Sequence, residues 1–329
     1  MRKIGLVLLV LLVLVGYIGC GKVIKISGKE MVVGSPKELK EINMGKSTRK
    51  GNKAKMVPTV TNSKIWFQAH RGGLREAPEN TMAAFRYVWE LGGIPEADIR
   101  TTKDNIIFCL HDSTLRRTTN APAAVGEANV STLMLEEVKA WDAGATFSPD
   151  FAGEKIPALA EVFAEMQDQP ENHVYLDLKQ VDLERLGSLI KEYEVGKQVI
   201  FCHNRQESLI AFRSITPGVR TMLWIGGKPE EIKSQFESAH QSGFKGLDQV
   251  QLHLRNTTTV KGETIYLLET KFLQYAIDKT RASDVDLEVL PFEFDDASLV
   301  YLLDLGIRWF ATDYPNRFAR SVRAWQANH

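Results

Sequence analysis

"FQAHRGGLREAPENTMAAF", residues 67–85, contains a complete passage from a strand to a helix. The apolar run at 65–70 predicts a short buried strand, and Pro-Glu-Asn-Thr at 78–81 is typical of a helix start. His70 and Arg71 stand between the two, where the strand gives way to a loop. The stretch therefore predicts one strand–loop–helix unit that carries an imidazole and a guanidinium at the end of its strand.

The same unit recurs along the rest of the chain, where strand-like apolar runs alternate with helix-like segments. We expect strands at 65–70, 94–98, 173–178, 198–203, 219–224, 246–251, 287–293 and 308–312. We expect helices at 80–92, 158–169, 182–195, 207–215, 229–243, 268–280 and 296–306. Eight strands alternating with helices have the size and rhythm of a (β/α)8 TIM barrel. A doubly wound open sheet is the alternative, but no Gly-rich phosphate loop supports it.

One stretch departs from this alternation. After Glu96 and Asp98, the turn signal Lys103-Asp104-Asn105 separates two extended segments. It predicts a hairpin above the second strand that brings His111 back near Glu96. Residues 113–155 then form an insertion before the next helix, and a position on the loop face suits a lid or a substrate-binding cap.

The bulk composition is that of an ordinary globular protein and hides a charge asymmetry. The 329 residues are 44% hydrophobic and 25% charged, with a formal net charge of zero. Residues 1–64 carry 13 Lys and Arg against 3 Asp and Glu, whereas the remainder carries 28 against 38. The body is acidic and has no basic stripe, which argues against nucleic acid as a partner.

The first 20 residues, MRKIGLVLLVLLVLVGYIGC, have the pattern of a secretory signal peptide, with basic residues, an apolar run and a small residue at the end. Cys20 after Gly19 resembles the cleavage box of bacterial lipoproteins, in which the cysteine is lipidated, although Tyr17 stands where Leu is usual. Plain secretion and an uncleaved anchor are the alternatives. Each predicts an exported protein of the cell envelope, either a membrane-anchored lipoprotein or a secreted or periplasmic one.

Residues 21–64 are rich in Lys, Gly and Ser and show no sustained hydrophobic period. We expect a basic, mostly disordered tether there, followed by the barrel domain at 65–322. The positive charge of the tether would attract it to an anionic membrane surface. A merely soluble spacer is the alternative.

Pairs of charged residues mark the ends of the second and third predicted strands. Glu96 and Asp98 are two residues apart, as are Asp177 and Lys179, so each pair shares one face of its strand. Carboxylates gathered at the mouth of a barrel repel one another unless a cation holds them, and oxygen ligands favour Mg²⁺ or Ca²⁺. The alternative is that a pair faces solvent or bonds to backbone.

Two histidines close neighbouring extended segments. A lone His at a strand end is more often structural, but His70 and His111 both aim at the predicted carboxylate cluster. Two imidazoles in such a place suit acid–base chemistry near neutral pH. Arg71 offers a planar fork for a phosphate, and Gly72 and Gly73 would let the backbone approach that phosphate closely.

Five segments, "AHRGG", "PENTMAAF", "EADIRTTKD", "HDSTLRRTTN" and "LLDLGIRWFATDYP", together resemble the glycerophosphodiester phosphodiesterase family in order and spacing over residues 65–320. The resemblance implies a (β/α)8 barrel with an insertion after the second strand. It also implies metal-dependent hydrolysis of glycerophosphodiesters (deacylated phospholipids) to glycerol 3-phosphate and an alcohol, a reaction of lipid and glycerol metabolism.

The resemblance also implies roles for individual residues. It makes His70 and His111 the general acid and base, and Arg71 and Lys179 the phosphate contacts. The implied ligands of one divalent cation, Mg²⁺ or Ca²⁺, are Glu96, Asp98 and Asp177. Asp177 stands where the family usually has Glu, and residues 291–294 replace a Trp-containing segment that lines the substrate site. The expected leaving-group contacts are His203, Trp224 and Phe292.

Several alternatives remain open at this point. Phospholipase D- or C-like action on (lyso)phospholipids could use the same two-histidine barrel, as could a lyase that releases a cyclic phosphate. A non-catalytic lipoprotein that binds a phosphate ligand is a different class of protein, and the shorter Asp177 keeps it open. Within the hydrolase hypothesis, the nucleophile is either a water molecule or the glycerol 2-hydroxyl.

Overall fold

The computed structural model describes residues 21–26, 29–34, 64–256 and 266–328. The predicted signal peptide at 1–20, with Cys20, lies outside the described residues, as does most of the predicted tether, residues 35–63. No helix within the described ranges is long and apolar enough to cross a membrane.

The first of two units in the chain, Met1–Thr59, contains a two-stranded antiparallel sheet. It pairs β1 (Gly21–Ile26) with β2 (Lys29–Gly34). The disorder expected across 21–64 therefore does not hold for these two segments. The Val and Ile residues of GKVIKI and KEMVVG favour strands, a local preference that the Lys- and Gly-rich composition of the whole segment hides.

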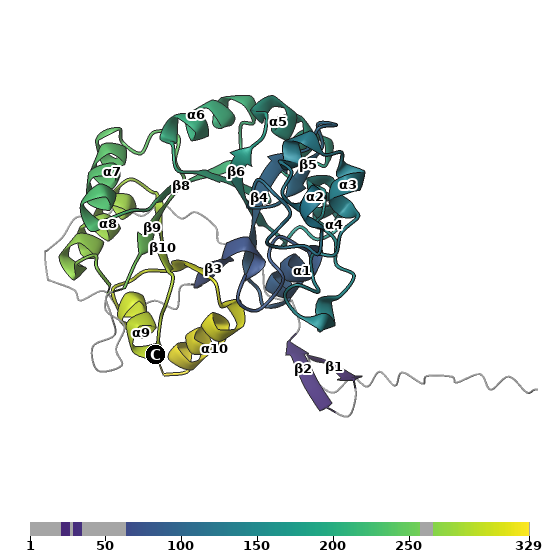
Figure 1. Cartoon of the computed structure of the whole chain (residues 1–329). Helices are drawn as coiled ribbons and strands as arrows, with labels where there is room; N and C mark the ends of the chain where they lie inside the picture. Colours follow the sequence, from purple (N-terminus) through teal and green to yellow (C-terminus); the bar gives the residue numbers. More distant parts are fainter. Residues whose placement is uncertain (1–20, 27–28, 35–63, 257–265, 329) are drawn as a thin grey trace, which may run out of the picture. The chain divides into compact units, whose positions relative to one another are not determined.

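The second unit, Val60–His329, is built around a closed barrel of parallel strands (Figure 1). The barrel strands are β3 (Trp66–Ala69), β4 (Ile94–Thr101), β6 (Val174–Gln180), β7 (Val199–His203), β8 (Arg220–Ile225), β9 (Gln249–Leu254), β10 (Asp286–Pro291) and β11 (Trp309–Thr312). Neighbouring strands follow the order β3-β11-β10-β9-β8-β7-β6-β4, and pairing of β3 with β4 closes the ring. The predicted (β/α)8 barrel is confirmed.

Helices surround the barrel on its outer side (Figure 1). They are α1 (Met82–Glu90), α4 (Leu159–Gln167), α5 (Leu183–Glu192), α6 (Gln206–Ile215), α7 (Pro229–Gln241), α8 (Thr270–Ala282), α9 (Asp296–Asp304) and α10 (Pro315–Gln326). Sequence analysis did not predict α10. It begins with Pro315, which suits a first helical turn, and buries Phe318, Val322 and Trp325 at helical spacing among charged residues.

The interior of the barrel is partly polar, and its polar groups are hydrogen-bonded to one another. The Tyr175 hydroxyl donates to Gln249 Oε1 at 3.0 Å and to Glu288 Oε2 at 3.2 Å. Gln251 Nε2 donates to Glu288 Oε1 at 2.9 Å and to Gln68 Oε1 at 2.7 Å. Burial raises the pKa of Glu288 to about 8. These side chains support the floor of the cavity described below, which Gln68 and Gln251 also line.

The hairpin predicted above the second strand is present. The end of β4 pairs antiparallel with β5 (Ile107–Cys109), in the register Ile99 with Cys109 and Thr101 with Ile107. Asn105 turns the chain with a φ of 62°, a left-handed conformation that Asn tolerates better than most residues. The hairpin returns the chain so that His111 lies on the same cavity as Glu96.

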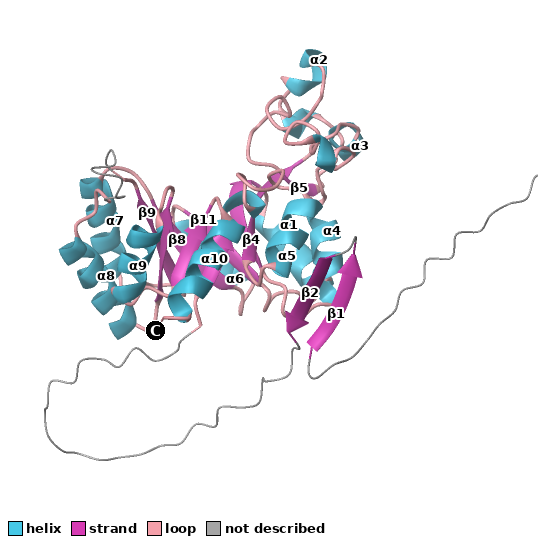
Figure 2. Ribbon diagram, turned by 90° about the horizontal axis from the view of Figure 1, so that it is seen from below, coloured by secondary structure: helices cyan, strands magenta, loops and turns pink. Residues whose placement is uncertain are grey.

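The insertion at 113–155 forms a small packed unit beyond β5. It contains α2 (Ala123–Gly126) and α3 (Leu135–Lys139), which Figure 2 shows set apart from the ring of barrel helices. Its apolar cluster is formed by Phe108, Leu110, Leu115, Val130, Leu133, Val138, Ala143 and Ile156. The insertion is therefore folded around its own core, to which the hairpin contributes.

Because Leu115 is fully buried in this cluster, Leu115→Ala should lower the free energy of unfolding by about 2–5 kcal/mol through lost burial and a new cavity. Urea unfolding followed by circular dichroism measures the change. Met134→Ala is the control, because that side chain is 42% exposed and its removal should change stability by less than about 0.5 kcal/mol. Equal effects of the two substitutions would contradict the packing described here.

Candidate active site

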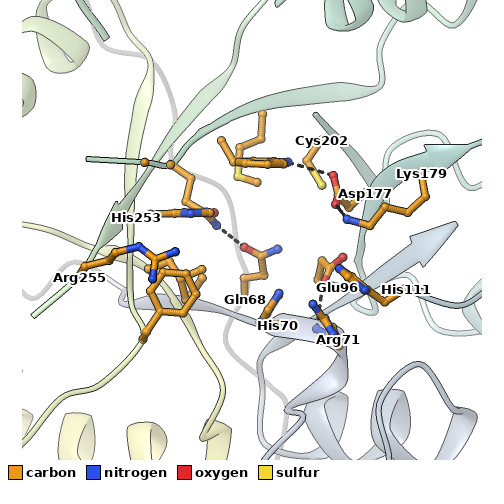
Figure 3. Close-up of a pocket in the computed structure, with 18 residues that line it drawn as sticks. Gln68, His70, Arg71, Glu96, His111, Asp177, Lys179, Cys202, His253 and Arg255 are labelled. Carbon is orange, nitrogen blue, oxygen red and sulfur yellow. Dashed lines mark hydrogen bonds and ion pairs between the residues drawn. The ribbon is translucent and has the colours of Figure 1, made fainter. Parts of the chain in front are cut away.

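A cavity of about 340 Å³ opens at the carboxyl ends of the barrel strands. Figure 3 shows side chains from distant parts of the sequence pointing into it. The residues singled out by sequence that line it are His70, Arg71, Glu96, His111, Asp177, Lys179, Trp224 and Phe292. The structure thus brings most of the predicted site residues together, at the end of a barrel where active sites of this fold lie.

A sharp turn follows β3 and carries His70 and Arg71. Arg71 has a φ of 54°, and its backbone N–H donates to Glu96 Oε2 at 2.7 Å. Gly72 and Gly73 continue the turn with φ of 79° and 88°. A Cβ on Gly72 would lie 2.8 Å from the Ala84 Cβ, and one on Gly73 would lie 2.6 Å from Pro315. Turn geometry and close helix packing therefore require these glycines, a reason that sequence analysis missed.

Three carboxylates form the centre of the site. Glu96 and Asp98 on β4 and Asp177 on β6 each offer one oxygen, and these oxygens all lie within 4.8 Å of one another. All three residues are buried. Lys179 Nζ lies 3.1 Å from Asp98 Oδ1 and 2.5 Å from Asp177 Oδ2. The shorter side chain of Asp177 does not remove it from the cluster.

Burial and nearby charges shift the pKa values of these three carboxyl groups in different directions. Burial, reinforced by the Asp98 charge, raises the pKa of Glu96 to about 8. Burial also raises the pKa of Asp177, against the opposing charge of Lys179. Burial acts in the same direction on Asp98, but Lys179 and the other nearby cations outweigh it and lower its pKa. Asp98 is therefore held in the charged form, whereas the protein environment favours the protonated forms of Glu96 and Asp177.

The residues of the cluster fit a divalent cation. Glu96 Oε1 is buried and has no hydrogen-bond partner among the described residues, an arrangement that costs free energy unless a ligand satisfies the atom. The available metal-ligand atoms are carboxylate oxygens, which suit hard cations such as Mg²⁺ and Ca²⁺. The orphaned oxygen and the donor chemistry both favour a metal between these three side chains.

Asp313 orients His70. Its Oδ1 lies 2.8 Å from His70 Nδ1, so Nδ1 carries the proton and Nε2 is left to face the cavity. Burial opposes the charged imidazole, but the Asp313 hydrogen bond and the Glu96 charge outweigh it, and the pKa of His70 is raised. Sequence analysis assigned no role to Asp313. Its signal is a carboxylate placed directly after the last strand, at the edge that carries the other site residues.

A chain of ion pairs links His111 to Arg71. His111 Nδ1 lies 2.7 Å from Asp112 Oδ1, and Arg117 Nε donates to Asp112 Oδ2 at 2.7 Å. Arg117 also donates to both oxygens of Glu79, at 2.6 and 2.8 Å, and Glu79 accepts from Arg71 Nη1 at 3.3 Å. The Arg117 hydrogen bonds lower the pKa of Asp112 to about 2.

The insertion contributes to the site through this chain. None of the described residues at 113–155 lines the 340 Å³ cavity, which differs from the expected substrate-binding cap. Arg117 instead bridges the insertion to the loop before α1. Sequence analysis missed Arg117, Asp112 and Glu79, although their opposite charges stand within the quoted motifs.

Aromatic side chains form the other side of the cavity. Trp224 Nε1 donates to Asp177 Oδ1 at 3.0 Å, and the indole stacks on His253 with ring centroids 5.3 Å apart. The His253 ring meets Phe292 edge-on at 5.3 Å. On β7, Cys202 rather than His203 lines the cavity, because successive side chains on a strand point to opposite faces. His203 is buried instead and accepts from the Arg205 backbone N–H at 3.2 Å.

A model of the glycerophosphoryl diester phosphodiesterase family matches residues 70–317. The chain is 39% identical over 163 residues to a glycerophosphodiester phosphodiesterase of Caldanaerobacter subterraneus, a match that covers 47% of this chain and 64% of that relative. It is 30% identical over 259 residues to the enzyme of the same name from Bacillus altitudinis, covering 76% of this chain and 94% of that one. The chain thus spans slightly less than two thirds of the Caldanaerobacter relative and nearly all of the Bacillus one.

Solved structures are similar in fold. A glycerophosphodiester phosphodiesterase from Agrobacterium tumefaciens superposes with a TM-score of 0.62 at 22% identity, covering 78% of this chain and 99% of that one. An Oleispira antarctica phosphodiesterase, crystallised in complex with the product sn-glycerol-3-phosphate, gives a TM-score of 0.60 at 19% identity, covering 78% and 96%. At these identities the likeness supports the barrel fold alone.

Removing the Asp313 charge should lower the pKa of His70. We expect the imidazole to titrate above its ordinary value of about 6.5 in the wild type and well below the wild-type value in Asp313→Asn, because burial then acts without the compensating carboxylate. NMR titration of the imidazole nitrogens measures both values. Asp248→Asn, which removes a carboxylate paired with Arg213, is the control. An unchanged His70 titration in Asp313→Asn would refute the pairing.

Cation binding at the carboxylates should be visible through Trp224, whose indole donates to Asp177. Adding Mg²⁺ or Ca²⁺ to metal-free protein is expected to change the tryptophan emission, and Asp177→Asn should weaken the apparent affinity at least about tenfold. The chain has 6 Trp, so Trp224→Phe identifies the source of the signal. A saturable change that survives in Trp224→Phe would place the cation elsewhere.

Proposed function

The chain belongs to the glycerophosphoryl diester phosphodiesterase family, and we propose that it is a phosphoric diester hydrolase that cleaves glycerophosphodiesters to glycerol 3-phosphate and an alcohol. The observation that carries the proposal is the arrangement around one cavity: His70, His111, Glu96 and Asp177 line it, and Asp98 completes the cluster of three buried carboxylates. Arg71 and Lys179 face the same cavity. Two groups able to move protons thus flank a site suited to one anionic phosphodiester.

We propose that Glu96, Asp98 and Asp177 hold one divalent cation, Mg²⁺ or Ca²⁺. When bound, such an ion supplies Lewis-acid stabilisation of charge on the non-bridging phosphate oxygens. Arg71 and Lys179 add fixed positive charge at the same place, and hydrogen bonds to ionised partners are the stronger kind. Together these groups would bind the phosphate and favour the more highly charged transition state over the substrate.

Proton transfer falls to the two imidazoles. His70 and His111 each place Nδ1 against a carboxylate, Asp313 and Asp112 respectively. Each therefore presents Nε2 as its free ring nitrogen. One takes the proton of the attacking hydroxyl and the other protonates the departing alkoxide, so that neither a free oxyanion nor hydronium has to form.

The size of the cavity and the position of Asp177 support this proposal. A volume of about 340 Å³ is sufficient for a ligand the size of a glycerophosphodiester. Asp177 keeps an oxygen within 4.8 Å of its two partners, which weakens the case for a non-catalytic binding protein. Activity on micellar lysophospholipid in place of soluble glycerophosphodiesters would instead favour a phospholipase.

We further propose export of the protein, with Cys20 as the site of lipidation. The support is the basic, apolar and small-residue pattern of residues 1–20. An envelope location would place the enzyme where deacylated phospholipids are available for scavenging. Recovery of the mature protein with residues 1–20 still attached and Cys20 unmodified would contradict this proposal.

The test of function uses metal-free protein with either cation restored and follows release of glycerol 3-phosphate from glycerophosphocholine and glycerophosphoethanolamine. We expect release to require the cation and His111→Ala to reduce kcat about 10²–10⁴-fold. His173→Ala is the matched control, because that side chain bonds the Glu171 backbone carbonyl away from the cavity and should not matter. No release from any glycerophosphodiester in the presence of bound cation would overturn the proposal.

A further inference from the structure

The wall of the cavity that faces the carboxylates has a distinct chemistry. It is formed by the ends of β8, β9 and β10, with Met222, Trp224, His253, Arg255, Leu290 and Phe292 as its main side chains. Figure 3 shows His253 and Arg255 across the cavity from Asp177, Lys179 and His111. We call this set of six residues the aromatic wall. It offers room for the part of a ligand that extends away from the phosphate.

Arg255 is the charged residue of the aromatic wall. It follows the end of β9 directly, and its side chain is exposed at the cavity. The guanidinium carbon lies 5.3 Å from the centre of the Phe292 ring. Across residues 64–256 and 266–328, no carboxylate forms an ion pair with it. The planar fork thus lies over an aromatic face, and no carboxylate within these ranges occupies its hydrogen-bond donors.

The other titratable group of the aromatic wall, His253, carries no charge near neutral pH. Burial, with His70 and Arg255 nearby, lowers the pKa of His253 to about 4. Its Nε2 lies 3.1 Å from Gln251 Oε1 in the buried polar layer below, and its ring stacks on Trp224 and meets Phe292 edge-on. His253 therefore acts as a fixed, neutral surface, and the charge of the wall comes from Arg255.

This arrangement discriminates between classes of alcohol. A quaternary ammonium or ammonium group usually binds over aromatic faces with a carboxylate nearby. No carboxylate belongs to the aromatic wall, and Arg255 already covers the Phe292 face. A cationic headgroup would meet a like charge there. A carboxylate or phosphate would instead meet an arginine fork suited to bidentate hydrogen bonding.

We propose that the aromatic wall receives the alcohol portion of the substrate and that Arg255 selects glycerophosphodiesters whose alcohol carries a second negative charge. The inference rests on the proposed function of the same cavity and adds the substrate class. The shared chemistry is an anionic group on the leaving alcohol, either a carboxylate or a second phosphate.

Two matched substrate pairs test it. Glycerophosphoserine differs from glycerophosphoethanolamine by one carboxylate, and glycerophosphoglycerol with a terminal phosphate differs from glycerophosphoglycerol by one phosphate. We expect kcat/KM of the wild-type enzyme to favour the anionic member of at least one pair by about tenfold or more. Arg255→Gln should reduce that preference to about twofold or less, and Arg255→Lys should retain part of it. The pair whose preference collapses identifies the anion.

Arg323→Gln is the matched control, because Arg323 is exposed on α10 and does not line the cavity. It should leave the substrate preference unchanged, and thermal unfolding of each variant establishes that it folds. Turnover of all four substrates with a preference that Arg255→Gln does not alter would overturn this inference and leave the proposed function standing. A wild-type preference for the cationic or neutral member of both pairs would also overturn it. Failure to cleave any glycerophosphodiester would overturn both this inference and the proposed function.

Discussion

Repulsion among three buried carboxylates is the constraint around which the site is organised. Glu96, Asp98 and Asp177 keep oxygens within 4.8 Å of one another, and all three residues are buried. Such a cluster is unfavourable unless donors and cations surround it. The positions of several neighbours follow from this need. Lys179 lies close to both Asp98 and Asp177. Each carboxylate also accepts one hydrogen bond: Asp98 from Asn80, Asp177 from Trp224, and Glu96 from the Arg71 backbone N–H. The left-handed turn at Arg71 is the local strain that aims this last group.

Closure of the barrel completes the site. His70 follows the first barrel strand and Asp313 follows the last, 243 residues later, and they meet because β3 pairs with β11. The second imidazole arrives by a different route, since the β4–β5 hairpin returns His111 to the cavity and the Arg117 ion pairs hold Asp112 in place. Each histidine is therefore oriented by a carboxylate: Asp313 reaches His70 across the barrel seam, whereas Asp112 directly follows His111 and is held by Arg117 of the insertion.

The sequence predicted the parts of this structure that depend on local pattern. Strand and helix periodicity located the eight barrel strands, and the two-residue spacing of Glu96 with Asp98 correctly implied a shared face. The carboxylate that orients His70 could not be predicted, because the pairing of Asp313 with His70 depends on a long-range strand register. Helix α10 was missed although Pro315 marks its start and Phe318, Val322 and Trp325 stand at helical spacing, so its signal was present in the sequence among the charged residues. His203 was wrongly predicted to line the cavity because the sequence located the end of this strand but not which of its side chains point inward. Neighbouring side chains on a strand point to opposite faces, so Cys202 lines the cavity instead.

The central claim is that the three carboxylates form one cation site that faces the substrate phosphate. Diffraction from crystals grown with Mn²⁺ and sn-glycerol 3-phosphate, recorded at the manganese absorption edge, locates such an ion directly. We predict one anomalous peak about 2.0–2.6 Å from an oxygen of each of Glu96, Asp98 and Asp177, with the phosphate between the ion and Arg71. A cavity without a peak at saturating Mn²⁺, or a peak that contacts none of the three carboxylates, would contradict it.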